Sequence, residues 1–163
     1  MLIAGIGNVF FGDDGFGVAV AQRLQQTTWP AAVRVKDFGI HGFDLAVELL
    51  DGYDVAIFVD AVQRGGLPGA LVAIELEVVA CGMESPSPHA MRLEEVFRVV
   101  RAWGGRLPQL FLVGCEPETL EPSEAAGAEA VLSPPVARAV DEVVRLIRDL
   151  VEQLLHEKPC QVS

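Results

Sequence analysis

Short, uninterrupted apolar runs alternate with helical patterns along the whole chain, and no other feature constrains the fold as strongly. A strand buried on both faces of a sheet is a continuous apolar run, and residues 55–59 (Val-Ala-Ile-Phe-Val) form such a run. Runs of this kind predict strands over residues 2–6, 33–38, 55–59, 70–76 and 109–113. Apolar residues at helical spacing predict helices over residues 14–26, 42–50, 88–103 and 136–154.

The alternation of strands and helices predicts an α/β fold, a three-layer α/β/α sandwich around a mostly parallel five-stranded sheet. The segment 70–76 follows the strand 55–59 after a short turn. If these two segments pair, they run antiparallel and the sheet is mixed. In such folds the active site lies outside the carboxyl ends of the parallel strands, so unusual residues at these positions are the candidates for chemistry.

The length of 163 residues fits one domain. The sequence has no internal repeat and no linker that would divide it. We therefore expect a single domain over residues 1–156 and a flexible tail over residues 157–163. Within the long acidic connection 114–133, a short helix is expected over residues 124–130.

The formal charge of −11 disfavours binding to nucleic acid or to an anionic membrane, because like charges repel. No apolar run is long enough to cross a bilayer, and the first residues lack the basic segment of a signal peptide. The widely spaced Cys81, Cys115 and Cys160 suit neither a disulfide framework nor a structural zinc site. We expect a cytoplasmic protein, and a monomer, because the sequence pattern shows no exposed apolar patch.

The segment after the first strand has the glycines of a nucleotide loop but not its full pattern. In GxGxxG, counted from Gly5 and Gly7, the third glycine would stand where the chain has Phe10, and no P-loop lysine follows. Asp13 and Asp14 come just before the next helix. They either cap that helix and complement its dipole, or one of them points into a cleft.

Three further residues lie near predicted strand ends or at a helix start. Asp60 directly follows the buried run 55–59, where a carboxylate is either solvated in a loop or paired with a cation. Asp37 has a similar position beside an ordinary turn. His89 follows Pro88 in the first helical turn and is either a surface residue or a metal ligand. Asp14, Asp60 and His89 together would suit a borderline divalent ion such as Zn²⁺ or Ni²⁺.

Five segments, in this order, resemble the hydrogenase maturation protease family over nearly the whole chain. They are Gly5-Ile6-Gly7-Asn8 with Asp13-Asp14-Gly15-Phe16-Gly17, then Asp37-Phe38-Gly39-Ile40-His41-Gly42-Phe43-Asp44-Leu45, Val59-Asp60-Ala61, Ser87-Pro88-His89 and Val113-Gly114-Cys115-Glu116-Pro117. Each segment is weak alone, but their order and spacing are specific. The first acidic position is often Glu in relatives and is Asp14 here, which keeps the ligand type but shortens the side chain.

The resemblance implies a small α/β/α endopeptidase that removes a C-terminal extension from the nickel-loaded large subunit of a nickel-iron hydrogenase. It also implies that Asp14, Asp60 and His89 contact the metal, while Asp37 and Asn8 are supporting candidates. No HExxH helix for a resident catalytic zinc is present, so we expect nickel to come with the substrate and no organic cofactor to be needed.

The nucleophile stays open at this point. Either the metal polarises a water, or Asp14 or Asp60 activates it as a base. A nucleophilic cysteine is not expected, because buried cysteine is the common case. The alternatives to a maturation protease are a small Rossmann-like nucleotide-binding module, another peptidase of similar fold that acts without nickel, and an inert scaffold.

Overall fold

The computed structural model describes residues 1–77, 88–123 and 130–156; for residues 88–92 it describes the backbone only. The segments 78–87, 124–129 and 157–163 lie outside this description, and with them the helix expected over 124–130 and the expected tail. The strands of the described part are β1 (Leu2–Ile6), β2 (Arg34–Gly39), β3 (Val55–Ala61), β4 (Leu71–Leu76) and β5 (Gln109–Cys115). The helices are the 3₁₀ helix η1 (Gly12–Gly15), α1 (Phe16–Gln25), α2 (Gly42–Leu49), α3 (Pro88–Ala102) and α4 (Pro134–His156).

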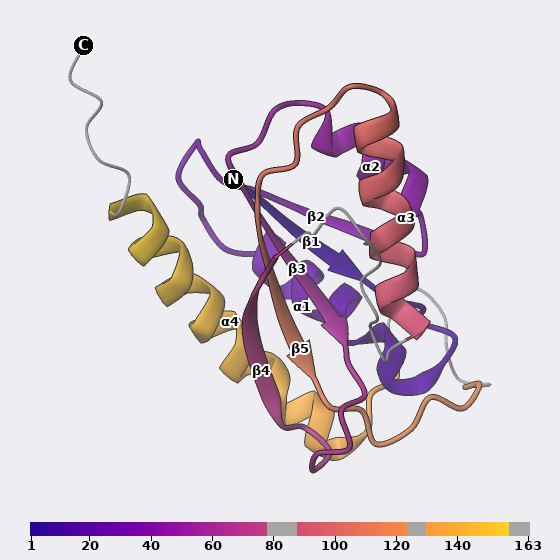
Figure 1. The fold of residues 1–163 in the computed structure, drawn as a ribbon. Helices are drawn as coiled ribbons and strands as arrows, with labels where there is room; N and C mark the ends of the chain where they lie inside the picture. Colours follow the sequence, from indigo (N-terminus) through magenta and orange to yellow (C-terminus); the bar gives the residue numbers. More distant parts are fainter. Residues whose placement is uncertain (78–87, 124–129, 157–163) are drawn as a thin grey trace.

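The strands form one mixed sheet in the order β2-β1-β3-β5-β4, in which only β4 runs antiparallel to its neighbour (Figure 1). The expectation of a mixed sheet is confirmed, but β4 does not pair with β3. β5 enters the sheet between them and pairs with both. β4 is thus an edge strand, in which one side of the ladder has no strand neighbour among the described residues.

Two apolar layers, one on each face of the sheet, account for the three-layer arrangement. Alternate residues of β1 and β3 point to opposite faces, as the pleat of a strand requires. Ile3 and Ile57 pack with residues of α1 and α4. Leu2 and Phe58 pack with residues of α2 and α3. Burying a side chain the size of Phe58 contributes about 1.5–3 kcal/mol, which explains why β3 is apolar from Val55 to Val59.

Two glycines let α1 approach the ends of β1 and β3 closely. A Cβ atom at Gly17 would lie 2.2 Å from the carbonyl oxygen of Ile6 and 2.1 Å from that of Val59. A Cβ atom at Gly5 would lie 2.3 Å from the carbonyl oxygen of Gly17. Since no side chain fits at either position, the helix start rests on the carboxyl ends of the two central strands. This contact places η1, which precedes α1, at the same edge.

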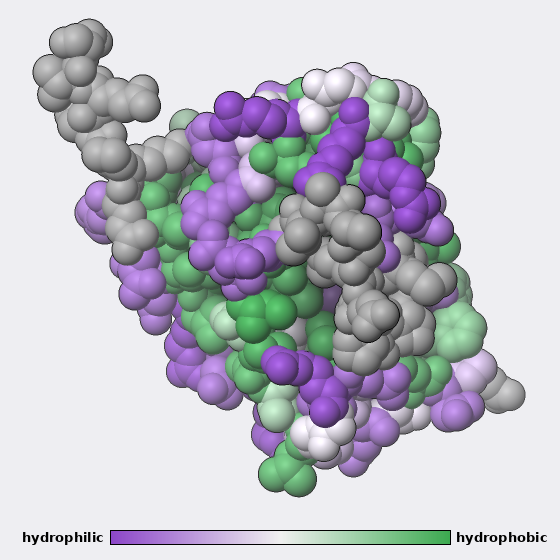
Figure 2. Space-filling view, viewed as in Figure 1, coloured by the Kyte–Doolittle hydropathy of each residue, from purple (hydrophilic) through white to green (hydrophobic). Residues whose placement is uncertain are grey.

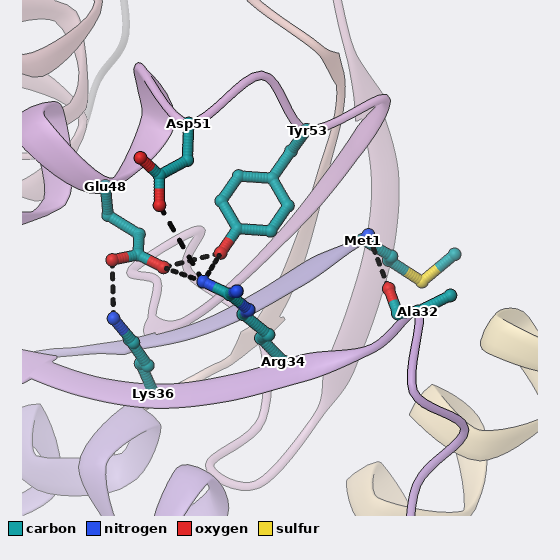
Figure 3. A network of polar contacts seen from close by, with 7 residues as sticks. All are labelled: Met1, Ala32, Arg34, Lys36, Glu48, Asp51 and Tyr53. Atoms are coloured by element: carbon teal, nitrogen blue, oxygen red, sulfur yellow. Dashed lines mark hydrogen bonds and ion pairs between the residues drawn. The ribbon is translucent and has the colours of Figure 1, made fainter.

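A polar network holds α2 against the outer strand β2 (Figure 3). It lies at the end of the sheet opposite to the carboxyl ends of β1 and β3. Glu48 of α2 accepts hydrogen bonds from Lys36 Nζ and from the hydroxyl of Tyr53, both at 2.5 Å. Arg34 lies 3.8 Å from Glu48 and 3.7 Å from Asp51. The network joins β2, α2 and the turn into β3.

The face of the molecule seen in Figure 2 mixes hydrophilic and hydrophobic residues, and hydrophobic residues gather over β4. Ile74 of this strand is 40% exposed. Among the described residues, no helix combines the length and the apolar character that crossing a membrane requires.

Candidate active site

Asp14 and Asp60 are buried acidic residues at the carboxyl edge of the central strands, and both have atoms near Gly7. Asp14 belongs to η1 and is 3% exposed, and Asp60 is the last but one residue of β3 and is 2% exposed. A Cβ atom at Gly7 would lie 1.8 Å from the carbonyl oxygen of Asp14 and 3.8 Å from Oδ1 of Asp60. Gly7 therefore lies beside the backbone of Asp14 and near the carboxylate of Asp60.

The turn between β1 and η1 is held by hydrogen bonds to Asp14 and Asn8. The backbone amide of Asn8 donates to Oδ2 of Asp14 (3.0 Å), and the amide of Phe10 donates to Oδ1 of Asn8 (3.1 Å). Asn8 thus shapes the turn that carries Asp14. Because an amide of this turn is bonded to a carboxylate of the protein itself, it is not offered to a phosphate. This geometry argues against a nucleotide-binding loop.

Asp60 is held in place by the strand that carries it. It lies opposite Gly114 in the parallel pairing of β3 and β5, and its Oδ1 accepts a hydrogen bond from the amide of Ala61 (2.8 Å). Gly7 has φ = +137°, a conformation that glycine adopts far more easily than other residues. The close approach of the Asp14 backbone to the end of β1 therefore depends on a glycine at position 7.

Asp13 has a different task from its neighbour. It is fully buried, and its carboxylate accepts hydrogen bonds from the amides of Glu118 (2.8 Å) and Thr119 (3.0 Å). It also accepts bonds from the amide (2.7 Å) and the hydroxyl (2.8 Å) of Ser133. The N-cap residue is Phe11 in η1 and Gly15 in α1, so the prediction that one of the two aspartates is an N-cap is wrong, although both lie in the first turn of η1. Asp13 instead ties η1 to two distant loops.

Asp37 lies at the neighbouring cavity rather than between the two buried aspartates. This cavity of about 370 Å³ is lined by Asp37 and Asn8 together with Phe10 and Ile40, and Gly7 forms part of its wall. Asp37 is exposed, and its carboxylate accepts hydrogen bonds from the amide of Gly39 (3.0 Å) and from Gln22 Nε2 (3.3 Å). Asp14 and Asp60 are not among the lining residues.

The backbone of His89 lies in the first turn of α3, as expected, and its side chain is outside the described part. Leu93 follows one helical turn later and lines a small cavity with Ile6 at the end of β1 and with Gly39 at the end of β2. α3 therefore begins near the edge of the sheet that carries Asp14 and Asp60 (Figure 1). Within residues 1–77, 93–123 and 130–156, no group of three possible metal-ligating side chains is close enough to hold an ion.

The one cysteine whose side chain the structure describes is unsuited to be a nucleophile. Burial, with an additional contribution from the charge of Asp13, raises the pKa of Cys115 to about 12. Its thiol lies 3.8 Å from the carbonyl oxygen of Glu116. A thiol with so high a pKa carries almost no thiolate at neutral pH. Cys81 and Cys160 lie outside the described residues.

Glu116 is a buried carboxylate whose role the sequence did not reveal. Its oxygens accept hydrogen bonds from the amides of Arg64 (2.8 Å) and Gly65 (3.1 Å), in the loop that follows β3. Its own backbone pairs with Ala70 and Gly69. Glu116 therefore fixes the loop next to Asp60. The only sequence sign of it was its place in the last of the five motif segments, directly after Cys115.

The doubly wound sheet, with two buried carboxylates at its carboxyl edge, defines a small α/β enzyme with an acidic site suited to a divalent cation or an activated water. Comparison with known proteins identifies the family to which this enzyme belongs. The model of the family described as hydrogenase maturation protease matches residues 18–150. The hydrogenase 2 maturation protease of Escherichia coli K12 is 30% identical over 154 residues, which cover 91% of both chains.

Other relatives agree with this assignment. The hydrogenase expression/formation protein HupD of Rhodobacter capsulatus is 33% identical over 154 residues, covering 92% of this chain and 70% of that protein. The solved structure of the hydrogenase maturating endopeptidase HybD from E. coli superposes with a TM-score of 0.78 at 28% identity, covering 93% of this chain and 91% of that chain. The chain belongs to the hydrogenase maturation protease family and is a peptidase.

Proposed function

We propose that this chain removes a C-terminal extension from the precursor of a nickel-iron hydrogenase large subunit, and that it recognises the nickel bound in that precursor. The observation that carries the proposal is that Asp14 and Asp60 are both buried and both have atoms near Gly7, at the carboxyl edge of the sheet in a chain of this family. The protein acts in the cytoplasm as a monomer, as one domain over residues 1–156, and needs no organic cofactor.

The donor set suits a borderline divalent ion that arrives with the substrate. Asp14 and Asp60 supply carboxylate oxygens, and His89 in the first turn of α3 supplies an imidazole nitrogen. Nickel held by the precursor then binds to these three side chains and brings the scissile peptide bond to a fixed position. Asn8 supports this arrangement by shaping the turn before Asp14, and Asp37 lines the adjoining cavity, where substrate residues next to the bond lie.

Hydrolysis itself consumes one water. The water loses a proton as its oxygen bonds to the carbonyl carbon, the C–N bond breaks, and the leaving amine gains a proton. Asp14 or Asp60 receives the first proton if a carboxylate is the base. If nickel polarises the water, the carboxylates serve only to hold the ion. The two routes can be distinguished with a precursor that carries another divalent ion of the same size in place of nickel, because they differ in whether such a precursor is still cleaved.

The experiment is intact mass spectrometry of a large-subunit precursor, nickel-loaded or nickel-free, after incubation with this protein. We expect loss of a C-terminal peptide only from the nickel-loaded precursor. Asp14→Asn and Asp60→Asn should reduce this cleavage at least about a hundredfold, whereas Asp149→Asn on the exposed side of α4 should leave it unchanged. Equal cleavage of the nickel-free precursor would contradict the proposal that nickel is recognised. Full activity of both variants would contradict the assignment of Asp14 and Asp60 to the active site.

A further inference from the structure

Five large apolar side chains form a continuous exposed surface along α2, although the sequence pattern showed no such patch. Phe43, Val47 and Leu50 follow one another at helical spacing on one face, preceded by Ile40 and joined by Trp103 from the end of α3. The rings of Phe43 and Trp103 meet edge to face, with centroids 5.5 Å apart. We call these five residues the α2 surface.

The size of the α2 surface distinguishes it from scattered surface hydrophobics. Phe43 is 63% exposed, Ile40 55%, Trp103 52%, Val47 45% and Leu50 37%. An aromatic side chain can bury roughly 150–250 Å², so the five leave an apolar area on the order of 400–500 Å². This lies in the range of the largest patch on a monomer, which is often functional. It is about half of what each partner contributes to a standard interface.

The α2 surface continues into the cavity next to the candidate active site. Ile40 belongs to it and also lines the cavity that contains Asn8 and Asp37. α2 begins at Gly42, next to this cavity. Its eight residues extend the apolar stripe over about 12 Å, in the direction away from the cavity. A partner that reaches the cleavage site and covers α2 as well would bury a surface of standard size. A partner seated on α2 alone would not.

We propose that the α2 surface binds an apolar patch on the folded body of the large-subunit precursor, while the C-terminal extension of that precursor occupies the cavity lined by Asn8 and Asp37. This proposal rests on the function proposed above. A second copy of the chain fits less well, because the area alone is too small for a stable dimer and two molecules of formal charge −11 repel each other. The α2 surface thus recognises the substrate at a distance from the bond that is cut.

The test compares the wild type with Phe43→Ser/Trp103→Ser on a nickel-loaded large-subunit precursor that the wild type cleaves. We expect KM to rise about tenfold or more, as for loss of aromatic residues at an interface centre, with kcat at saturation unchanged. Phe43→Ser alone, at a mostly exposed position, keeps the test valid if the double variant does not fold. The control Ile74→Ser removes an exposed apolar side chain from β4, at the opposite edge of the sheet, and should leave KM unchanged.

A binding measurement separates the body of the substrate from its extension. The probe is the same precursor with its C-terminal extension deleted. It should bind the wild type, and the double variant should weaken this binding by the same factor as it raises KM. An unchanged KM overturns the proposal, and so does failure of the extension-free precursor to bind the wild type. If the wild type is a dimer and the double variant is a monomer, the α2 surface binds a second copy of the chain instead, and the proposal is overturned. If the wild type cleaves no precursor, the function proposed above has failed instead.

Discussion

Asp13 and Asp14 are neighbours with the same side chain, and their surroundings give them different tasks. Asp13 is fully buried and accepts bonds from three backbone amides and one hydroxyl in segments far along the chain. Asp14 accepts a bond from the amide of Asn8 within its own turn, and its backbone carbonyl lies beside Gly7, near Oδ1 of Asp60. Substitution should therefore separate stability from activity at these two adjacent positions.

Asp13→Ala should lower the free energy of unfolding by about 1–3 kcal/mol, because a fully buried donor left without an acceptor costs about this much and the three donor amides here are only partly buried. The donors are the amides of Glu118, Thr119 and Ser133. Urea denaturation followed by circular dichroism measures the change. Asp149→Asn, on the exposed side of α4, is the control and should change the stability by less than about 0.5 kcal/mol. A loss of less than 1 kcal/mol for Asp13→Ala would contradict the structural role.

Gly7→Ala should be more harmful than an ordinary glycine substitution. The added Cβ would lie 1.8 Å from the carbonyl oxygen of Asp14, and φ at this position is +137°. Gly52→Ala is the matched control, because Gly52 also has positive φ (+81°) but no atom within 4 Å of the added Cβ. The control should lose only roughly 1–2 kcal/mol for the backbone conformation. Equal losses of stability in thermal unfolding would mean that the contact with Asp14 is unimportant.

At the scale of elements, the network around Glu48 attaches α2 to β2 and should make stability depend on acid pH. Burial alone would raise the pKa of Glu48, but the hydrogen bonds from Lys36 and Tyr53 outweigh it and lower the pKa below 4.5. A carboxyl with a lowered pKa in the folded state stabilises the protein above its unfolded pKa, and this contribution is lost as pH falls through the folded value.

Glu48→Gln should therefore destabilise the protein at pH 7 and have a progressively smaller effect as pH falls below about 4.5, where the wild type loses the same contribution. Urea denaturation at several pH values between 3 and 7 measures the difference. Glu152→Gln, exposed on α4, is the control and should show no such convergence. A difference between wild type and Glu48→Gln that stayed constant over this range would show that the charge of Glu48 contributes nothing.

Sequence patterns predicted the elements well because strand and helix periodicity are local. The continuous run at 55–59 is buried on every residue, and the glycine-rich turn after β1 carries Asp14 as expected. The partner of β4 could not be predicted, because insertion of β5 between β3 and β4 depends on contacts of distant segments. The residue pattern alone could not distinguish Asp13 from Asp14 for the same reason, since the partners of Asp13 lie 105 to 120 residues away, and only the family resemblance favoured Asp14.

For the whole molecule, two weakly acidic groups in different layers should make the fold sensitive to alkaline pH. Burial, with a hydrogen bond to Glu48, raises the pKa of Tyr53 from 10.0 to about 12. Burial, with the charge of Asp13, raises the pKa of Cys115 from 9.0 to about 12. A group with a raised pKa stabilises the folded state fully below its unfolded pKa, and this contribution is lost as pH rises through the folded value.

Stability should thus be constant up to about pH 9 and should decline from there towards pH 12, first through Cys115 and above about pH 10 also through Tyr53. The high negative charge adds repulsion in the same direction, because every deprotonation makes a formal charge of −11 more negative. Cys115→Ala and Tyr53→Phe remove one titrating group each, so each variant should lose less stability between pH 9 and 12 than the wild type does. The measurement is the urea midpoint as a function of pH at low and at high salt, because added salt weakens the general repulsion between exposed charges but has little effect on the titration of groups whose pKa is raised by burial. Parallel declines in the wild type and both variants would assign the alkaline loss to repulsion and remove the role of the two buried groups.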